Sequence, residues 1–131
     1  MPLDEIDAGV CRVLIVRDTL PQNITERLVA SEQFEVQVAR TTFDAGVQVQ
    51  QTKPHVIILN VDGNTSDAID LCQEMRKHAA SEDCRIIAAA TEPSQNQRAE
   101  LIANGFDMCV PKPFSLDNVL KGLEDATNLI H

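Results

Sequence analysis

Asn60 is the first residue whose position suggests chemistry, because it directly follows the apolar run at 56–59. In open α/β sheets, ligands and reacting groups collect just beyond the carboxyl ends of the strands. A functional side chain is therefore expected here, and the chain places an uncharged amide at this point. Asp62 follows two residues later with the same strand parity, so its carboxylate is expected near the same site.

The composition predicts one globular domain spanning residues 1–131, with residues 1–10 as an N-terminal extension. The chain has 131 residues, is 44% hydrophobic and contains neither Trp nor Tyr, which predicts a single aliphatic core. Its net charge of −9 argues against binding to nucleic acid or to anionic membranes. The N-terminus has no basic segment of a signal peptide, and no apolar run is long enough to span a bilayer. We expect a soluble, cytoplasmic protein.

The sequence lacks the spacing of common metal, redox and nucleotide sites. No two of its cysteines have C-x-x-C spacing, and its three histidines are scattered, so we expect reduced thiols and no metal site. Neither G-x-G-x-x-G nor G-x-x-x-x-G-K-[ST] occurs, which disfavours a Rossmann dehydrogenase and a P-loop nucleotidase. The cysteines are Cys11, Cys72, Cys84 and Cys109.

Strand and helix patterns alternate along the whole chain. Apolar runs predict strands at 11–16, 34–38, 56–59, 85–90 and 108–110, with the second strand at an edge of the sheet. Helical patterns occupy 21–31 and 42–51, and three further helices are expected to be capped by Ser66, Ser94 and Ser115. Ser94 forms a capping box with Gln97, and Asn104-Gly105 ends that helix. Five such units predict an α/β fold with a doubly wound parallel sheet.

Apolar spacing predicts which face of each helix is buried. The first helix should bury Ile24 and Leu28, and the second has Phe43, Val47 and Gln50 in register. The third helix should bury Ile69, Leu71, Cys72 and Met75, and the last should bury Leu116, Val119, Leu120 and Leu123.

Three segments resemble the receiver domain of two-component response regulators, the CheY-like family. The segment at 105–114 resembles the family's fifth strand with its Lys-Pro-Phe ending, and the segment at 54–60 resembles the third strand. The segment at 13–18 resembles the first strand and its acidic pair. The resemblance implies a flavodoxin-like five-stranded sheet of order 2-1-3-4-5. It also implies phosphoryl transfer to an aspartate, with Mg²⁺ held by two further acids.

Against that pattern, most of the reactive residues are replaced. Asn60 stands at the acceptor position, Arg17 replaces the first metal-binding acid, and Asp18 retains the second. Ala90 stands where the family has Ser or Thr, with Thr91 next to it. Cys109 occupies the aromatic switch position, Lys112 is retained, and the resemblance implies a cis bond before Pro113. Arg17, Asp18 and Lys112 sum to a charge of +1, so we expect no Mg²⁺ and no other cofactor.

These replacements predict a degenerate pseudo-receiver rather than an enzyme. It would act in two-component or phosphorelay-type signalling as a phosphorylation-independent interaction module, as a monomer or weak homodimer. The resemblance implies that signalling proteins dock on the surface formed by the fourth helix, fifth strand and fifth helix, or on the first helix. One alternative is a phosphorylatable receiver using Asp62, and another is an anion sensor using Arg17 and Lys112. Otherwise Asp62 should pair with Arg17 or be solvated, and Lys112 should pair with Asp18 and hydrogen-bond Asn60.

Overall fold

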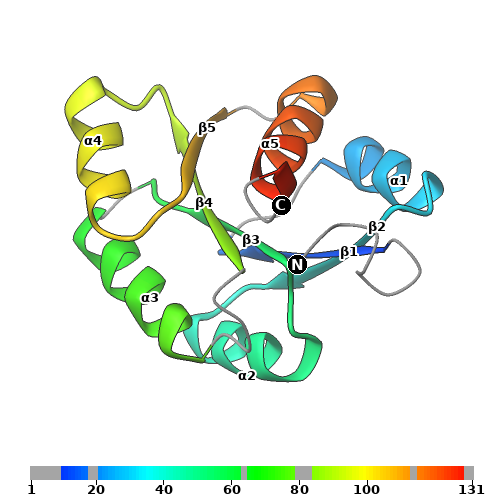
Figure 1. Cartoon of the computed structure of the whole chain (residues 1–131), viewed down its shortest axis with the longest axis horizontal. Helices are drawn as coiled ribbons and strands as arrows, with labels where there is room; N and C mark the ends of the chain where they lie inside the picture. The colour runs from blue at the N-terminus through cyan, green and yellow to red at the C-terminus, as the bar shows by residue number, and fades with distance from the viewer. Residues whose placement is uncertain (1–9, 18–20, 63–64, 79–83, 113–114, 129–131) are drawn as a thin grey trace.

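The computed structural model describes residues 10–17, 21–62, 65–78, 84–112 and 115–128. Five strands alternate with five helices in these segments (Figure 1). The strands are β1 (Cys11–Val16), β2 (Phe34–Ala39), β3 (Val56–Asn60), β4 (Arg85–Thr91) and β5 (Met108–Lys112). The helices are α1 (Gln22–Ala30), α2 (Thr42–Thr52), α3 (Thr65–His78), α4 (Gln95–Ala103) and α5 (Leu116–Asn128).

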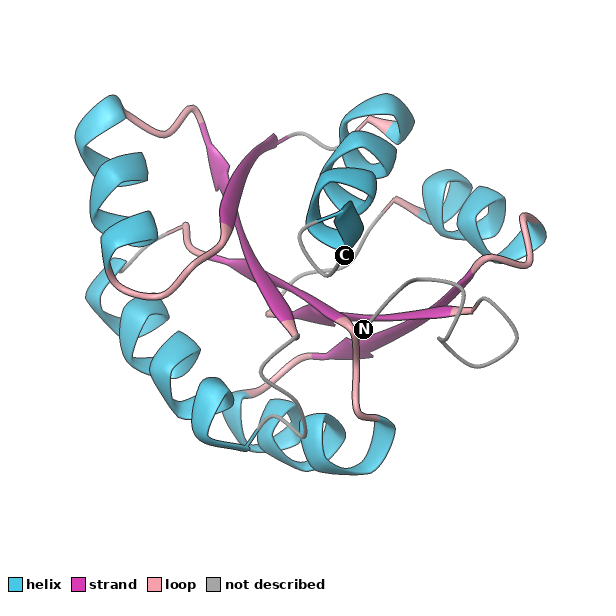
Figure 2. Ribbon diagram, viewed as in Figure 1, coloured by secondary structure: helices cyan, strands magenta, loops and turns pink. Residues whose placement is uncertain are grey.

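The strands form one parallel sheet in the order β2-β1-β3-β4-β5, which confirms the predicted fold class. Helices α1 and α5 cover one face, and α2, α3 and α4 cover the other (Figure 2). Asn60 aligns with Ala89 of β4, and Thr91 of β4 aligns with Lys112 of β5. The strand register therefore brings the carboxyl ends of β3, β4 and β5 to one edge of the sheet.

The core consists of two aliphatic layers, one on each face of the sheet. Side chains alternate along a strand, so Leu14 and Val16 of β1 join one layer while Val13 and Ile15 join the other. Every one of these four side chains is buried. Because β1, β3 and β4 are covered on both faces, their sequences read as continuous apolar runs.

Most predicted helix faces and caps are confirmed. Ile24 and Leu28 are buried in α1, all four predicted positions are buried in α3, and Val119 and Leu123 are buried in α5. Leu120 is only partly buried, and the predicted position of the Leu116 side chain lies outside what the structure describes. The Ser94 hydroxyl accepts from the Gln97 amide, and Ser115 accepts from the Asn118 amide. Gly105 follows α4 with a φ of 118°, as the predicted left-handed helix end requires.

Two predictions about helices are wrong. Helix α3 begins at Thr65, so Ser66 lies within its first turn and does not cap it. Helix α2 buries Ala45 and Val49, whereas Phe43 is 82% exposed. Both faces of α2 carry apolar residues, and the face with Ala45 and Val49 joins the core between the sheet and α3.

Asp107 connects three segments at the amino-terminal edge of the sheet. Its Oδ2 accepts from Arg76 Nη2 at 2.7 Å and from the Ile86 amide at 2.9 Å. Its Oδ1 lies 3.7 Å from Arg85 Nη1. Arg76 also donates to the carbonyl of Gly105. This carboxylate thereby links α3, the start of β4 and the segment that leads into β5.

The four cysteines are free thiols, as predicted. Burial raises the pKa of Cys11 and Cys72 to about 11 and that of Cys84 to about 12. These thiols therefore remain protonated at neutral pH.

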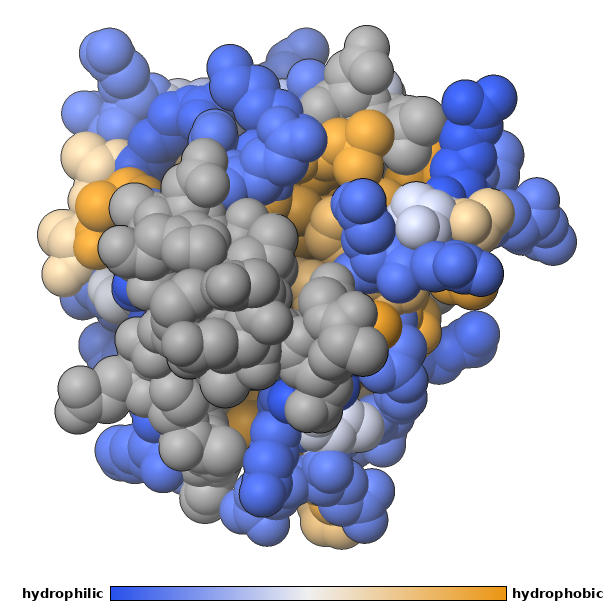
Figure 3. All heavy atoms as spheres, turned by 45° about the vertical axis from the view of Figure 1, so that its right-hand side comes forward, coloured by the Kyte–Doolittle hydropathy of each residue, from blue (hydrophilic) through white to orange (hydrophobic). Residues whose placement is uncertain are grey.

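Hydrophilic residues dominate the described surface in the view of Figure 3. Within the described residues, none of the helices has the length and apolarity needed to cross a bilayer.

Candidate functional site

Four polar residues from β3, β4 and β5 meet at the carboxyl edge of the sheet. We call Asn60, Asp62, Thr91 and Lys112 the carboxyl-edge cluster. Lys112 Nζ donates to Asn60 Oδ1 at 3.0 Å, which confirms the predicted hydrogen bond. The same ammonium lies 2.9 Å from Asp62 Oδ2. Lys112 therefore contacts both the amide at the strand end and the carboxylate two residues beyond it.

Both carboxylate oxygens of Asp62 accept hydrogen bonds from Thr91. The Thr91 amide donates to Oδ1 at 2.9 Å, and its hydroxyl donates to Oδ2 at 3.1 Å. Partial burial raises the pKa of Asp62, but the hydrogen bonds from Thr91 and Lys112 and the lysine charge outweigh that effect. The net result is a lowered pKa. The contacts of the charged carboxylate therefore stabilise the fold at pH values above the ordinary aspartate pKa of about 4. This stabilisation is lost as the pH falls through the lowered pKa that Asp62 has in the folded state.

The expectation that Asp62 pairs with Arg17 or is merely solvated is wrong, because its ion pair is with Lys112. The sequence did not reveal this because the ends of β3 and β5, which flank β4, come close together only in the folded sheet. The correction also changes the charge of the site. Once Asp62 is included, the charges of Arg17, Asp18, Asp62 and Lys112 sum to zero. The net positive charge expected from the sequence is therefore removed by a neighbouring carboxylate.

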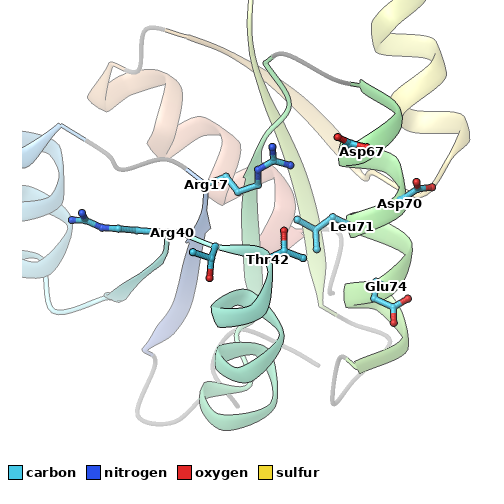
Figure 4. A pocket seen from close by; sticks show the side chains of 8 residues that line it. Arg17, Arg40, Thr42, Asp67, Asp70, Leu71 and Glu74 are labelled. Atoms are coloured by element: carbon cyan, nitrogen blue, oxygen red, sulfur yellow. The ribbon is translucent and has the colours of Figure 1, made fainter.

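Arg17 leaves β1 with a left-handed φ of 65° and has an exposed side chain. Its carbonyl accepts from Asn60 Nδ2 at 3.3 Å. The side chain lines an open pocket of about 600 Å³, together with Arg40 and the α3 residues Asp67, Asp70 and Glu74 (Figure 4). Lys112 is not among the described residues that line this pocket. The structure thus separates the side chains of Arg17 and Lys112.

Thr91, and not Ala90, brings a hydroxyl to the carboxyl-edge cluster. Ala90 is buried within β4, whereas Thr91 is exposed and faces Asp62. The sequence shows Thr91 beside Ala90, but only the strand register reveals that its hydroxyl reaches the carboxyl-edge cluster. Cys109 is partly buried, and its carbonyl accepts from Arg98. Asp18 and Pro113 lie outside the described residues, and so do the expected Asp18–Lys112 pair and the cis bond.

The described residues of this edge do not fit Mg²⁺, which prefers several hard oxygen ligands. Asn60 Oδ1 already accepts from Lys112 and from the Asp62 amide at 3.0 Å each. The Asp62 carboxylate is neutralised by Lys112, and Arg17 brings a further positive charge to the end of β1. No group of three or more His, Cys, Asp or Glu side chains in the described part of the chain could hold a metal ion.

A doubly wound parallel sheet with a polar cluster at its carboxyl edge defines a CheY-like α/β domain. The family model for the response regulator receiver domain matches residues 13–124. The chain therefore belongs to the receiver domain family of two-component signalling. Members of this family are signalling modules rather than typical enzymes.

Two similar bacterial proteins support the same assignment. Response regulator MprA of Mycobacterium sp. strain KMS is 24% identical over 83% of this chain and 47% of its own length. PhoB, the phosphate regulon transcriptional regulatory protein of Rhizobium meliloti, is 26% identical over 83% of this chain and 48% of its length. The chain thus spans about half the length of these curated relatives.

Solved structures share the fold over nearly the whole chain. A response regulator from Thermotoga maritima has a TM-score of 0.78 at 15% identity, covering 91% of this chain and 98% of that one. The chemotaxis response regulator CheY4 of Vibrio cholerae has a TM-score of 0.75 at 24% identity, covering 89% and 98%. At these identities the likeness supports the fold alone.

Proposed function

We propose that this receiver domain is a pseudo-receiver, a protein interaction module whose output does not depend on aspartyl phosphorylation. The observation that carries the proposal is the amide at position 60. Asn60 stands at the end of β3, where the family's acceptor carboxylate is expected, and its Oδ1 accepts from Lys112 at 3.0 Å. A neutral amide is a poor nucleophile and forms no aspartyl phosphate. Lys112 in this arrangement holds the loops together.

The two alternative functions receive less support from the geometry. Asp62 as phosphoryl acceptor would have to attack with an oxygen whose charge is already stabilised by donors, because Oδ1 accepts from the Thr91 amide and Oδ2 accepts from the Thr91 hydroxyl and pairs with Lys112. An anion sensor would need Arg17 and Lys112 to face one ligand. Instead, Lys112 is paired with Asp62, and Arg17 lines a pocket that contains three carboxylates.

A module of this kind acts through its surface, and we propose the face formed by α4, β5 and α5 as the docking site for signalling proteins. Ile102 of α4 is 47% exposed, and Val29 of α1 is 52% exposed, so the two form a matched pair on the two candidate surfaces. A charge placed at the centre of an interface typically disrupts binding. Ile102→Glu should therefore abolish partner binding, whereas Val29→Glu should leave it intact.

The proposal can be tested by affinity capture of signalling partners on the immobilised chain, with and without acetyl phosphate. We expect the same proteins to be retained in both conditions and to be lost with Ile102→Glu. Retention that requires acetyl phosphate would overturn the proposed function. Loss with Val29→Glu instead would place the docking site on α1.

The proposal also includes independence from metal. Millimolar Mg²⁺ should leave the melting temperature unchanged, because a ligand stabilises the folded state only if it binds that state. Differential scanning calorimetry with Mg²⁺ and with Na⁺ at matched ionic strength measures this effect. Sub-millimolar Mg²⁺ affinity in calorimetric titration, abolished by Asp18→Ala, would show that the site does hold the metal.

A further inference from the structure

We propose that the carboxylate of Asp62 permanently occupies an oxyanion site formed by Thr91 and Lys112, and that it holds the turn between β4 and α4 in one conformation. This inference rests on the proposed function, in which the pocket receives no phosphoryl group. The Asp62 carboxylate is the group that fills the pocket in place of a phosphoryl group. Asp62 is thus a positioning residue supplied by the chain itself.

The donors of this site converge on one carboxylate from two different strands. They are the Lys112 ammonium at 2.9 Å, the Thr91 amide at 2.9 Å and the Thr91 hydroxyl at 3.1 Å. One cation together with N–H and O–H donors aimed at the same point is the arrangement that binds an oxyanion. The side chain of Lys112 is 16% exposed, and that of Asp62 is 36% exposed. The site therefore suits a carboxylate, a sulfate or a phosphate.

Asn60 explains how Asp62 reaches these donors. Its side-chain Oδ1 accepts from the Asp62 amide two residues later at 3.0 Å, the pattern of an Asx turn. This turn directs the chain after β3 so that the Asp62 side chain lies against β4 and β5. Because it is covalently attached, Asp62 has a high effective concentration at the site. Free anions at millimolar concentration therefore compete with it poorly.

The backbone conformation of Glu92, the residue after Thr91, indicates which part of the fold the contacts of Asp62 hold in place. Glu92 has a left-handed φ of 46°, which residues other than Gly, Asn and Asp rarely adopt. It directly follows Thr91, whose amide and hydroxyl are both held by Asp62, and it precedes the Ser94 cap of α4. A strained turn of this kind persists only where its surroundings determine it. The contacts of Asp62 supply that constraint, and they thereby fix the approach of the chain to α4.

The test is NMR spectroscopy on the full chain and its Asp62→Ala variant, with inorganic phosphate as the probe. In the wild type, the Thr91 amide should be protected from hydrogen exchange and should not respond saturably to millimolar phosphate. In Asp62→Ala, exchange at Thr91 should be at least about tenfold faster, because its acceptor is gone. The vacated donors should then bind phosphate, with saturable shifts centred on Thr91 and Glu92. A second substitution, Lys112→Gln, should abolish that binding.

Asp70→Ala serves as the matched control, because it also removes one exposed carboxylate but lies on α3 outside the carboxyl-edge cluster. It should reproduce the wild type in both measurements. Asp62→Asn, which keeps the shape but removes the charge, gives a second variant should Asp62→Ala fold poorly, and it should also bind phosphate more tightly than the wild type. The proposal is overturned if Thr91 keeps its protection in Asp62→Ala. It is also overturned if neither Asp62 variant binds phosphate, or if the wild type binds it equally well.

These outcomes are separate from those of the proposed function. The NMR measurements use no phosphoryl donor, and they report only on which group contacts Thr91 and Lys112. A wild type that accepted a phosphoryl group would refute the pseudo-receiver while leaving the resting contacts of Asp62 unchanged. Conversely, an Asp62→Ala variant that resembles the wild type would refute the oxyanion site without restoring a nucleophile at position 60.

Discussion

Asn60→Asp alone should leave the chain phosphorylated by acetyl phosphate poorly or not at all. The substitution supplies a nucleophile of the same shape, but Arg17 still replaces an acid at the end of β1. The new phosphoryl group would also meet Asp62, whose carboxylate already holds Lys112 at 2.9 Å and both donors of Thr91. The variant would therefore still lack a metal-binding acid at position 17, and Asp62 would repel the phosphoryl group and compete with it for Lys112 and Thr91.

Arg17→Asp combined with Asn60→Asp should be phosphorylated at least about tenfold faster than the single variant, which corresponds to only about 1.4 kcal/mol of barrier. The reason is that an acidic pair at 17 and 18 can then hold Mg²⁺. Intact-mass kinetics on the wild type and both variants measure the difference. Arg17→Gln with Asn60→Asp is the matched control, because it removes the positive charge without adding a ligand. If the single variant reacts as fast as the double, the charge at position 17 is irrelevant.

Even the double variant should show little response at its output surface. A ligand shifts a conformational equilibrium only through different contacts with the two states. Ala90 is buried and has no hydroxyl, and the side chain at the switch position is that of Cys109 rather than an aromatic ring. The phosphorylated double variant should therefore retain the partner affinity of the unmodified chain.

Asp107→Ala should lower the free energy of unfolding by about 2–4 kcal/mol. The substitution removes the acceptor of Arg76 and of the Ile86 amide, and it also removes the carboxylate beside Arg85. The Asp107 side chain is only 20% exposed, so water replaces these contacts incompletely. Asp107→Asn should cost less, because the amide keeps one oxygen acceptor.

Equilibrium unfolding in urea measures this effect through the midpoint at constant slope. Asp70→Ala, an exposed acid on α3, is the control and should change stability by no more than about 0.5 kcal/mol. A loss below about 1 kcal/mol for Asp107→Ala would show that water replaces the contacts of this carboxylate.

The fold was predictable because the local apolar patterns and the order of the elements along the chain both indicate a parallel α/β sheet. Apolar runs that alternate with helical patterns permit few topologies, and β1, β3 and β4 are covered on both faces. The buried face of α2 was not predictable from residue size. Phe43 is the largest apolar residue of the helix, yet it is 82% exposed, and the buried side chains are those of Ala45 and Val49.

The sequence also placed Asn60 correctly at the end of β3, but it did not reveal the contacts of the residues around it. The Asn60–Lys112 hydrogen bond followed from the resemblance, whereas the partner of Asp62 depends on how β3, β4 and β5 align. In a parallel sheet no tight turn fixes that alignment, so the role of Thr91 could not be read from one sequence. The sequence shows only a threonine directly after the apolar run at 85–90.

The most direct test of the account is the intact mass of the wild-type chain after incubation with acetyl phosphate and Mg²⁺. Asn60 supplies no nucleophilic oxygen, and both carboxylate oxygens of Asp62 are engaged by Thr91 and Lys112. We therefore predict an unchanged mass under conditions that phosphorylate a receiver domain with an intact acceptor aspartate. A wild-type chain that gains the mass of one phosphoryl group, retained in Asp70→Ala and lost in Asp62→Ala, would contradict the pseudo-receiver and identify Asp62 as the acceptor.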